Sequence, residues 1–125
     1  IIGNGGSMAM ASHMMAEFIG IYENKRALPA IALTDITTMS ALANDVGYRN
    51  VFSRQVEALG KKGDVLITFS TSGTSFNIIE AIYEARLRGI DVVDMPRIKG
   101  TTQEIQENQL HLTHEICKQV KQYFK

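Results

Sequence analysis

Hydrophobic and polar positions alternate along the chain in short blocks that predict strands and helices in turn. Four apolar runs have the length and composition of strands: Ile1–Ile2, Leu28–Thr34, Val65–Phe69 and Ile90–Val93. Amphipathic stretches between them predict helices over Met8–Ile21, Thr37–Ala43, Val51–Leu59, Phe76–Leu87 and Thr101–Tyr123. Because Val65–Phe69 is apolar on both faces, we expect this strand at the centre of a sheet.

This alternation is typical of an α/β fold in which a mainly parallel sheet is covered by helices on both faces, a three-layer αβα sandwich. The stretch Thr101–Tyr123 predicts a long C-terminal helix that closes the fold. Residues 94–97 follow the strand at Ile90–Val93 with no room for a crossover helix, so the alternation is shortened here. We expect one domain over residues 1–125.

Composition and charge restrict the function. The 125 residues carry 13 Lys+Arg and 13 Asp+Glu, and this zero net charge argues against a nucleic-acid partner. No apolar run reaches the ~18 residues that cross a bilayer, so no membrane partner is expected. The lone cysteine, Cys117, has no partner for an internal disulfide, and we expect a cytoplasmic protein. Ile1–Ile2 is typical of the end of a strand, which predicts a further segment before it.

Two polar loops follow predicted strands, where parallel sheets bind their ligands. The first, Gly3–Ser7, is called the glycine loop; its glycines let backbone N–H groups approach an anion. The second, Ser70–Ser75, is called the serine loop and offers a hydroxyl at every position but Gly73. Each loop alone also fits a plain turn or a helix cap, but two at one sheet edge favour a phosphorylated small molecule. Neither matches the dinucleotide or P-loop pattern.

The candidate acid–base residues lie on the first and last predicted helices. His13 and Glu17 are four residues apart, so they share a helix face and fit either a proton relay or a metal site. The same spacing fits a solvated carboxylate beside a packing histidine. Gln106 and His114 on the last helix share a side only loosely, and we interpret His111 as structural.

Several blocks, taken in order, resemble the sugar isomerase (SIS) domain of phosphoheptose isomerases. They are Gly3–Ser7, His13-x-x-x-Glu17, Leu28–Thr34, Ala43–Tyr48, Val51–Ala58, Gly63–Ile67, Ser70–Ser75 and Ile105–Glu107. The resemblance covers nearly all of residues 1–93 and implies the Rossmann-like, flavodoxin-like SIS fold.

This resemblance implies an enzyme, an aldose–ketose isomerase that converts sedoheptulose 7-phosphate to D-glycero-D-manno-heptose 7-phosphate. That reaction is the first step of bacterial ADP/GDP-heptose biosynthesis, which supplies lipopolysaccharide and other surface glycans. The resemblance also implies a cytoplasmic homotetramer with active sites at subunit contacts. Matched position by position, Glu17 and His114 form the acid–base pair. The implied binding positions for the phosphorylated seven-carbon sugar are Asn4, Gly5, Gly6, Ser7, Asn44, Asp45, Ser70, Thr71, Ser72, Ser75 and Gln106.

Some family members bind zinc, and their ligands match His13, Glu17, Gln106 and His114. We expect one weakly held zinc ion per subunit, because glutamine is a poor zinc ligand. Isomerisation needs a base, an enediol intermediate and an acid, roles that Glu17 and His114 fit. A zinc-bound Glu17 is a poorer base, so its role stays divided between ligand and base.

Two departures from the family pattern qualify the resemblance. The helical segment before the first strand is absent, and so is a stretch between Val93 and Pro96. The sequence is therefore expected either to be part of a longer protein or to contain a real deletion of a strand.

The runner-up function is a non-catalytic SIS module that binds a sugar phosphate or a protein partner, as in proteins that bind the replication initiator. Such modules keep a serine-rich loop but do not need the acid–base pair, so Glu17 and His114 favour the enzyme. An isomerase for another phosphosugar also stays open, because the sequence does not locate the contacts that select chain length.

Overall fold

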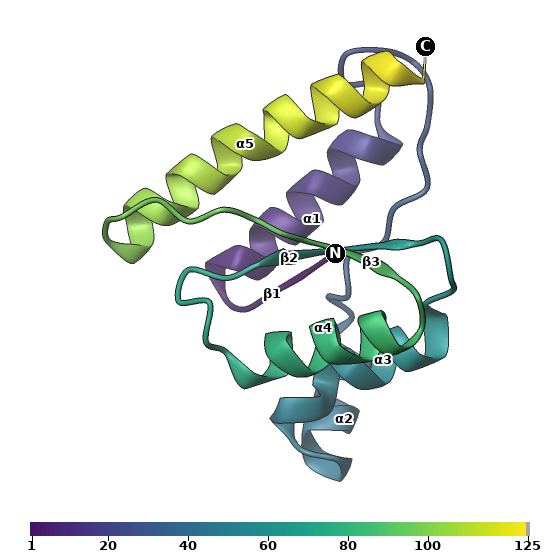
Figure 1. The fold of residues 1–125 in the computed structure, drawn as a ribbon, viewed down its shortest axis with the longest axis vertical. Coiled ribbons are helices and arrows are strands. Elements are labelled where there is room, and N and C mark those ends of the chain that lie inside the picture. The colour runs from purple at the N-terminus through teal and green to yellow at the C-terminus, as the bar shows by residue number, and fades with distance from the viewer. Residues whose placement is uncertain (125) are drawn as a thin grey trace.

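The computed structural model describes residues 1–124, which form a parallel sheet with helices on both faces (Figure 1). The strands are β1 (Ile2–Gly3), β2 (Val65–Phe69) and β3 (Asp91–Asp94), and they lie in the order β1-β2-β3. Both neighbouring pairs are parallel, with Ile2 opposite Thr68 in the first pair. The strand expected at the centre of the sheet is thus confirmed there.

The helices form the two outer layers of the fold. Helices α1 (Gly6–Ile19) and α5 (Thr102–Tyr123) pack against each other on one face of the sheet. Helices α2 (Ile36–Asp45), α3 (Val51–Leu59) and α4 (Phe76–Leu87), with the 3-10 turn η1 (Tyr48–Asn50), lie on the other face. The predicted three-layer α/β architecture and the closing C-terminal helix are therefore confirmed.

Two apolar clusters hold the layers together. Phe52 of α3, Leu66 of β2 and Ile78 of α4 belong to one cluster. Met14 of α1 and Cys117 of α5 belong to the other and are fully buried. Each such side chain stabilises the fold by about 1.5–3 kcal/mol when it leaves water. Burial also raises the pKa of the Cys117 thiol to about 12, so this free cysteine stays a protonated packing residue.

Local sequence signals set where the helices begin. Asp35 caps α2, since its carboxylate accepts a hydrogen bond from the Thr38 backbone N–H at 2.8 Å. Thr101 and Glu104 form a capping box at the start of α5, in which each side chain accepts from the other residue's backbone N–H. The last helix is therefore fixed at the end nearest the predicted site.

Three expectations from the sequence need correction. Residues 28–34 form no strand, because their pairing beside the two-residue β1 is confined to Ile1, whose amine donates to the Ile31 carbonyl and whose carbonyl accepts from the Leu33 N–H. Helix α1 begins and ends two residues earlier than predicted. The apolar residues of the amphipathic stretch Phe76–Leu87 do not all face the core, since Ile78 is buried whereas Ile79 and Tyr83 are 44% and 61% exposed.

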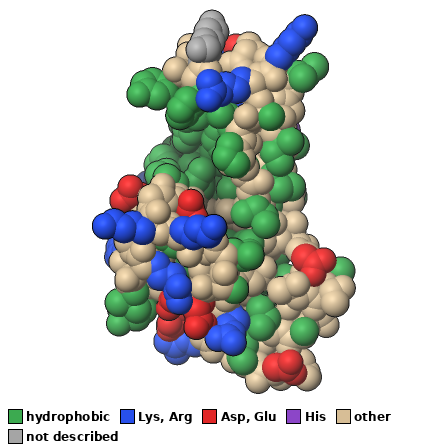
Figure 2. Space-filling view, turned by 90° about the vertical axis from the view of Figure 1, so that its right-hand side faces the viewer, with side chains coloured by type: hydrophobic (Ala, Val, Ile, Leu, Met, Phe, Trp, Pro, Cys, Tyr) green, Lys and Arg blue, Asp and Glu red, His purple; other side chains and the backbone are tan. Residues whose placement is uncertain are grey.

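An apolar groove opens at the end of the sheet where β2 begins, opposite the predicted site. Figure 2 shows hydrophobic side chains in this hollow, and its lining includes Phe18, Leu28, Val65, Ile90 and Val120. It contains little of the polar chemistry expected of a sugar-phosphate site. Within residues 1–124, no helix has both the length and the apolar character needed to cross a membrane.

Candidate functional site at the carboxyl edge of the sheet

Both predicted ligand loops lie at the carboxyl edge of the sheet. The glycine loop joins β1 to α1, and the serine loop joins β2 to α4. Because β1 and β2 are paired in parallel, the two loops are brought to the same edge, as the sequence predicts. Each loop leads directly into a helix, whose first N–H groups face this edge.

The glycine loop is a tight turn into α1. Gly5 has a φ of +56°, a conformation that favours glycine, and the Ser7 N–H donates to the Asn4 carbonyl at 3.0 Å. Ser7 itself is buried. The amide of Gln106 lies directly against Gly6, where an added Cβ would come within 2.7 Å of Gln106 Nε2. Gln106 of α5 therefore lies over the glycine loop, and both are substrate-binding positions that the resemblance implies.

The serine loop is held by hydrogen bonds among its own groups. Ser70 Oγ accepts from the Gly73 N–H at 3.0 Å, and Ser72 Oγ accepts from the Thr74 N–H at 3.1 Å. Ser72 and Ser75 place their hydroxyl oxygens 3.4 Å apart at the start of α4. The loop thus presents hydroxyls and a helix N-terminus together, a combination suited to an anion.

Arg97 is a neighbour of the serine loop that sequence reasoning missed. Its Nη1 donates to the Ser70 carbonyl at 3.3 Å, and a Cβ at Gly73 would lie 2.9 Å from its Nη2. Arg97 also pairs with Asp94, which accepts a hydrogen bond from the Thr68 hydroxyl at 2.7 Å. Burial raises the pKa of Asp94, but the hydrogen bonds from Arg97 and Thr68 outweigh it and lower the pKa overall. No spacing signal points to this contact, since Arg97 follows a different strand.

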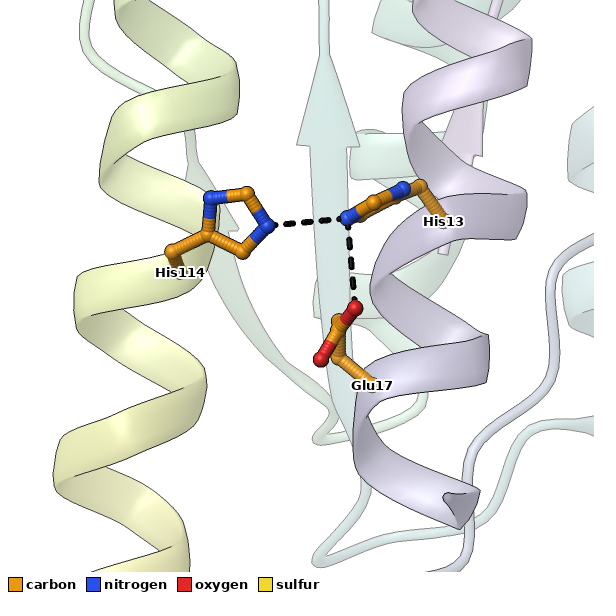
Figure 3. A group of neighbouring side chains, drawn as sticks. All are labelled: His13, Glu17 and His114. Atoms are coloured by element: carbon orange, nitrogen blue, oxygen red, sulfur yellow. Dashed lines mark hydrogen bonds and ion pairs between the residues drawn. The ribbon is translucent and has the colours of Figure 1, made fainter. Parts of the chain in front are cut away.

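The acid–base candidates meet between α1 and α5 (Figure 3). His13 and His114 face each other with their Nε2 atoms 3.0 Å apart, and His13 Nε2 lies 3.3 Å from Glu17 Oε1. These three residues, called the histidine cluster, place one ligand atom each within 4.8 Å of the others. The His13 side chain is 41% exposed and Glu17 19%, so a small molecule can reach them. Residues 101 positions apart in the sequence are thereby joined.

The donor set of the histidine cluster fits a divalent metal ion. Two imidazole nitrogens and one carboxylate oxygen are common zinc ligands, which bind at ~2.0–2.1 Å. Two ligand atoms on a tetrahedral ion at that distance are about 3.3 Å apart. The separations of His13 Nε2 from His114 Nε2 and from Glu17 Oε1, 3.0 and 3.3 Å, are close to this value, whereas His114 and Glu17 lie within 4.8 Å of each other and must approach to share one ion.

Tyr22 is a second residue that sequence reasoning missed. Its ring centroid lies 5.8 Å from that of His114. Burial raises the pKa of the Tyr22 hydroxyl, and the nearby charges of Glu23, Glu17 and Glu115 raise it further. Tyr22 therefore stays a neutral phenol that packs beside the histidine cluster.

Three other predicted site residues, Gln106, Asn44 and Asp45, lie away from the histidine cluster. Gln106 contacts Gly6, and His114 contacts His13, so α1 and α5 run in the same direction. Gln106 and His114 are eight residues apart, which places them about 12 Å from each other along α5. In this arrangement Gln106 faces the glycine loop, and its role as a fourth metal ligand stays a prediction. Asn44 and Asp45 end α2, exposed and hydrogen-bonded to each other at 3.1 Å.

Comparison with known families and structures agrees with this arrangement. The SIS domain family profile matches residues 1–95. The structure of a phosphoheptose isomerase from Neisseria gonorrhoeae superposes with a TM-score of 0.88 at 38% identity, covering 97% of this chain and 76% of that one. A phosphoheptose isomerase from Francisella tularensis gives 0.83 at 31% identity, covering 94% of this chain and 75% of that one. The fold and the site together thus define a SIS domain.

Curated relatives narrow the family further. A phosphoheptose isomerase from Cytophaga hutchinsonii is 54% identical over 92 residues, which are 73% of this chain and 48% of that protein. One from Campylobacter concisus is 41% identical over all of this chain and 76% of its own length. The latter alignment runs over 143 residues, more than the 125 present here, so that relative contains residues with no counterpart in this chain. The chain belongs to the phosphoheptose isomerase family of SIS domains.

Proposed function

We propose that this chain forms a single SIS domain and isomerises sedoheptulose 7-phosphate to D-glycero-D-manno-heptose 7-phosphate. The observation that carries the proposal is the histidine cluster, assembled from two helices beside two anion-suited loops in a member of this family. The non-catalytic alternative is not favoured, because a module that only binds has no need for an exposed His–Glu–His group.

The serine loop is proposed to hold the phosphate end of the substrate. Its hydroxyls and the first N–H groups of α4 supply donors without a free cation, since Arg97 is paired with Asp94. The glycine loop and Gln106 are proposed to contact the sugar hydroxyls, because both have backbone or amide groups at the same edge. We retain Asn44 and Asp45 as predicted contacts of the sugar.

Proton transfer is proposed to use the histidine cluster. Glu17 takes a proton from the hydroxyl-bearing carbon beside the substrate carbonyl while His114 protonates the carbonyl oxygen, which together give an enediol. Glu17 then returns its proton to the former carbonyl carbon as His114 takes the proton of the other enediol oxygen, where the new carbonyl forms. His13 lies within hydrogen-bond reach of His114. Tyr22 covers one side of His114 and limits its exposure to water.

We further propose zinc as the ion that His13, Glu17 and His114 would hold. A bound zinc ion supplies a Lewis acid that polarises the substrate carbonyl. On the basis of the family resemblance, we also propose that the protein is a cytoplasmic homotetramer and acts in the synthesis of lipopolysaccharide heptose.

Turnover of sedoheptulose 7-phosphate by the metal-stripped and the zinc-supplemented protein tests this function. We expect aldoheptose phosphate to form, and Glu17→Gln to abolish it with the thermal unfolding temperature unchanged. Glu107→Gln is the matched control, because among residues 1–124 this exposed α5 carboxylate accepts a side-chain hydrogen bond from Gln103 alone. A folded wild-type protein that binds the sugar phosphate without turning it over would favour the non-catalytic module instead.

Metal binding has a readout separate from turnover. Zinc should raise the thermal unfolding temperature of the wild type, since a ligand that binds only the folded state stabilises it. The shift should disappear in His114→Ala, and an equal shift in both proteins would place the ion elsewhere.

A further inference from the structure

Asn77, the second residue of α4, joins the two ligand loops directly. Its side-chain amide and that of Asn4 form a reciprocal pair, in which each Nδ2 donates to the other residue's Oδ1 at 2.9 and 2.8 Å. Asn4 belongs to the glycine loop, whereas Asn77 follows the serine loop, 73 positions later. This pair is the direct side-chain link between the starts of α1 and α4 among the hydrogen bonds of residues 1–124.

Tyr48 restrains the pair from a third segment. Tyr48 lies in the turn η1, and its hydroxyl donates a hydrogen bond of 3.0 Å to Asn4 Oδ1. Asn4 Oδ1 therefore accepts two hydrogen bonds, which occupies both of its lone pairs. Rotation of the Asn4 amide would break three hydrogen bonds at once, so one N–H of its Nδ2 is held in a fixed direction.

Asn77 has no comparable role within its own helix. Ser75 precedes α4 as its cap residue, and the hydrogen bonds of the Asn77 side chain within residues 1–124 go to Asn4 alone. Asn77 is only 3% exposed, and a buried amide without partners would cost about 1–3 kcal/mol. A polar side chain at this buried position is thus explained by its contact with the glycine loop.

We propose that Asn77 is a positioning residue that, through Asn4, fixes the separation of the glycine and serine loops so that one sugar phosphate contacts both. The inference rests on the proposed function, because it assigns the phosphate end of the ligand to one loop and the sugar end to the other. A ligand that spans both loops loses affinity when they move independently, since it must then pay to order them. A ligand that occupies the serine loop alone does not.

Two probes distinguish positioning from a general structural role. Sedoheptulose 7-phosphate spans both loops, whereas inorganic phosphate occupies only the serine loop. We expect Asn77→Ala to raise the Kd and KM for the sugar phosphate about tenfold, the equivalent of ~1.4 kcal/mol. The Kd for inorganic phosphate should stay within about twofold of the wild type on the same reasoning.

A double-mutant cycle with Asn4→Ala tests whether Asn77 acts through Asn4. The intact protein, Asn4→Ala, Asn77→Ala and the double variant are titrated with both probes by calorimetry and assayed for turnover. We expect Asn77→Ala to have little further effect once Asn4 is alanine. Asn24→Ala is the matched control, because its amide donates to the Lys121 carbonyl near the C-terminal end of α5, away from both loops.

Asn77→Ser provides a second variant that adds no charge beside the proposed phosphate position. The serine hydroxyl keeps a polar group at this buried position, yet it is too short to restore both hydrogen bonds to the Asn4 amide. The same selective loss of sugar-phosphate affinity is expected. An additive cycle, or equal losses for both probes, would overturn the positioning role.

The outcomes also separate this inference from the proposed function. Failure of the wild type to turn over the sugar phosphate would refute the isomerase, while the two binding titrations still decide the role of Asn77. A wild type that binds neither probe would overturn both.

Discussion

Gly6→Ala is expected to uncouple the stability of this protein from its activity. The new Cβ would lie 2.7 Å from Gln106 Nε2 and 3.0 Å from Gln106 Oε1, closer than packed atoms approach. These atoms are the end of a flexible side chain, so Gln106 withdraws by several tenths of an ångström while the backbone stays in place. Alanine is also a better helix former than glycine, by up to about 1 kcal/mol. The free energy of unfolding should therefore be unchanged or slightly higher.

Substrate binding should respond in the opposite direction. A displaced Gln106 loses one hydrogen bond to the sugar, worth about 0.5–1.5 kcal/mol. A loss of about 1.4 kcal/mol, near the upper end of this range, raises KM for sedoheptulose 7-phosphate about tenfold, with a smaller effect on kcat. Because Gln106 faces the glycine loop, zinc affinity should not change with Gly6→Ala. A fall in zinc affinity would instead support Gln106 as the fourth metal ligand.

The assay is steady-state turnover and urea unfolding of the wild type, Gly6→Ala, Gln106→Ala and the double variant. If the added methyl acts by displacing Gln106, it has no further effect on KM in the Gln106→Ala background. An equal rise in KM in both backgrounds would refute the reasoning, as would a Gly6→Ala protein with unchanged KM.

Two further predictions concern stability. Lys121 is fully buried and donates to the carbonyls of Gly20 and Arg26 at 2.6 and 2.7 Å. Lys121→Met leaves both carbonyls unpaired and should lower the free energy of unfolding, measured by urea titration, by about 2–4 kcal/mol. A loss below the error of the measurement would contradict this role. The fold lowers the pKa of Asp94 despite burial, chiefly through the hydrogen bond from Arg97. Ionised Asp94 therefore stabilises the native state above its unfolded pKa of 3.8, and this contribution is lost as pH falls through the lower folded pKa. The advantage of the wild type over Asp94→Asn in unfolding free energy should be constant from about pH 6 to 5 and shrink from there to about pH 3. A difference that stays constant down to about pH 3 would show that the charge is not involved.

Much of the fold followed from local pattern in the sequence. Val65–Phe69 and Phe76–Leu87 match β2 and α4 because each has a clear apolar pattern bounded by turn residues or a polar loop. The Asp35 cap is equally local, since it depends on residues three apart. The prediction of a strand at Leu28–Thr34 was wrong, and the reason lies in the tertiary structure. Whether it pairs as a strand depends on the length of β1 beside it, which its own residues do not encode.

The site divides in the same way. The sequence by itself determined that the two loops would share one edge, because parallel strands place their carboxyl ends together. The resemblance to phosphoheptose isomerases implied Glu17 and His114 as the acid–base pair. The resemblance also implied that His13 and His114 hold one zinc ion, but their direct contact follows from the tertiary structure, since it depends on how α1 packs against α5. Arg97 beside the serine loop and Asn77 paired with Asn4 carry no spacing signal for the same reason. Contacts between segments distant in the chain depend on packing, and packing is a property of the whole fold.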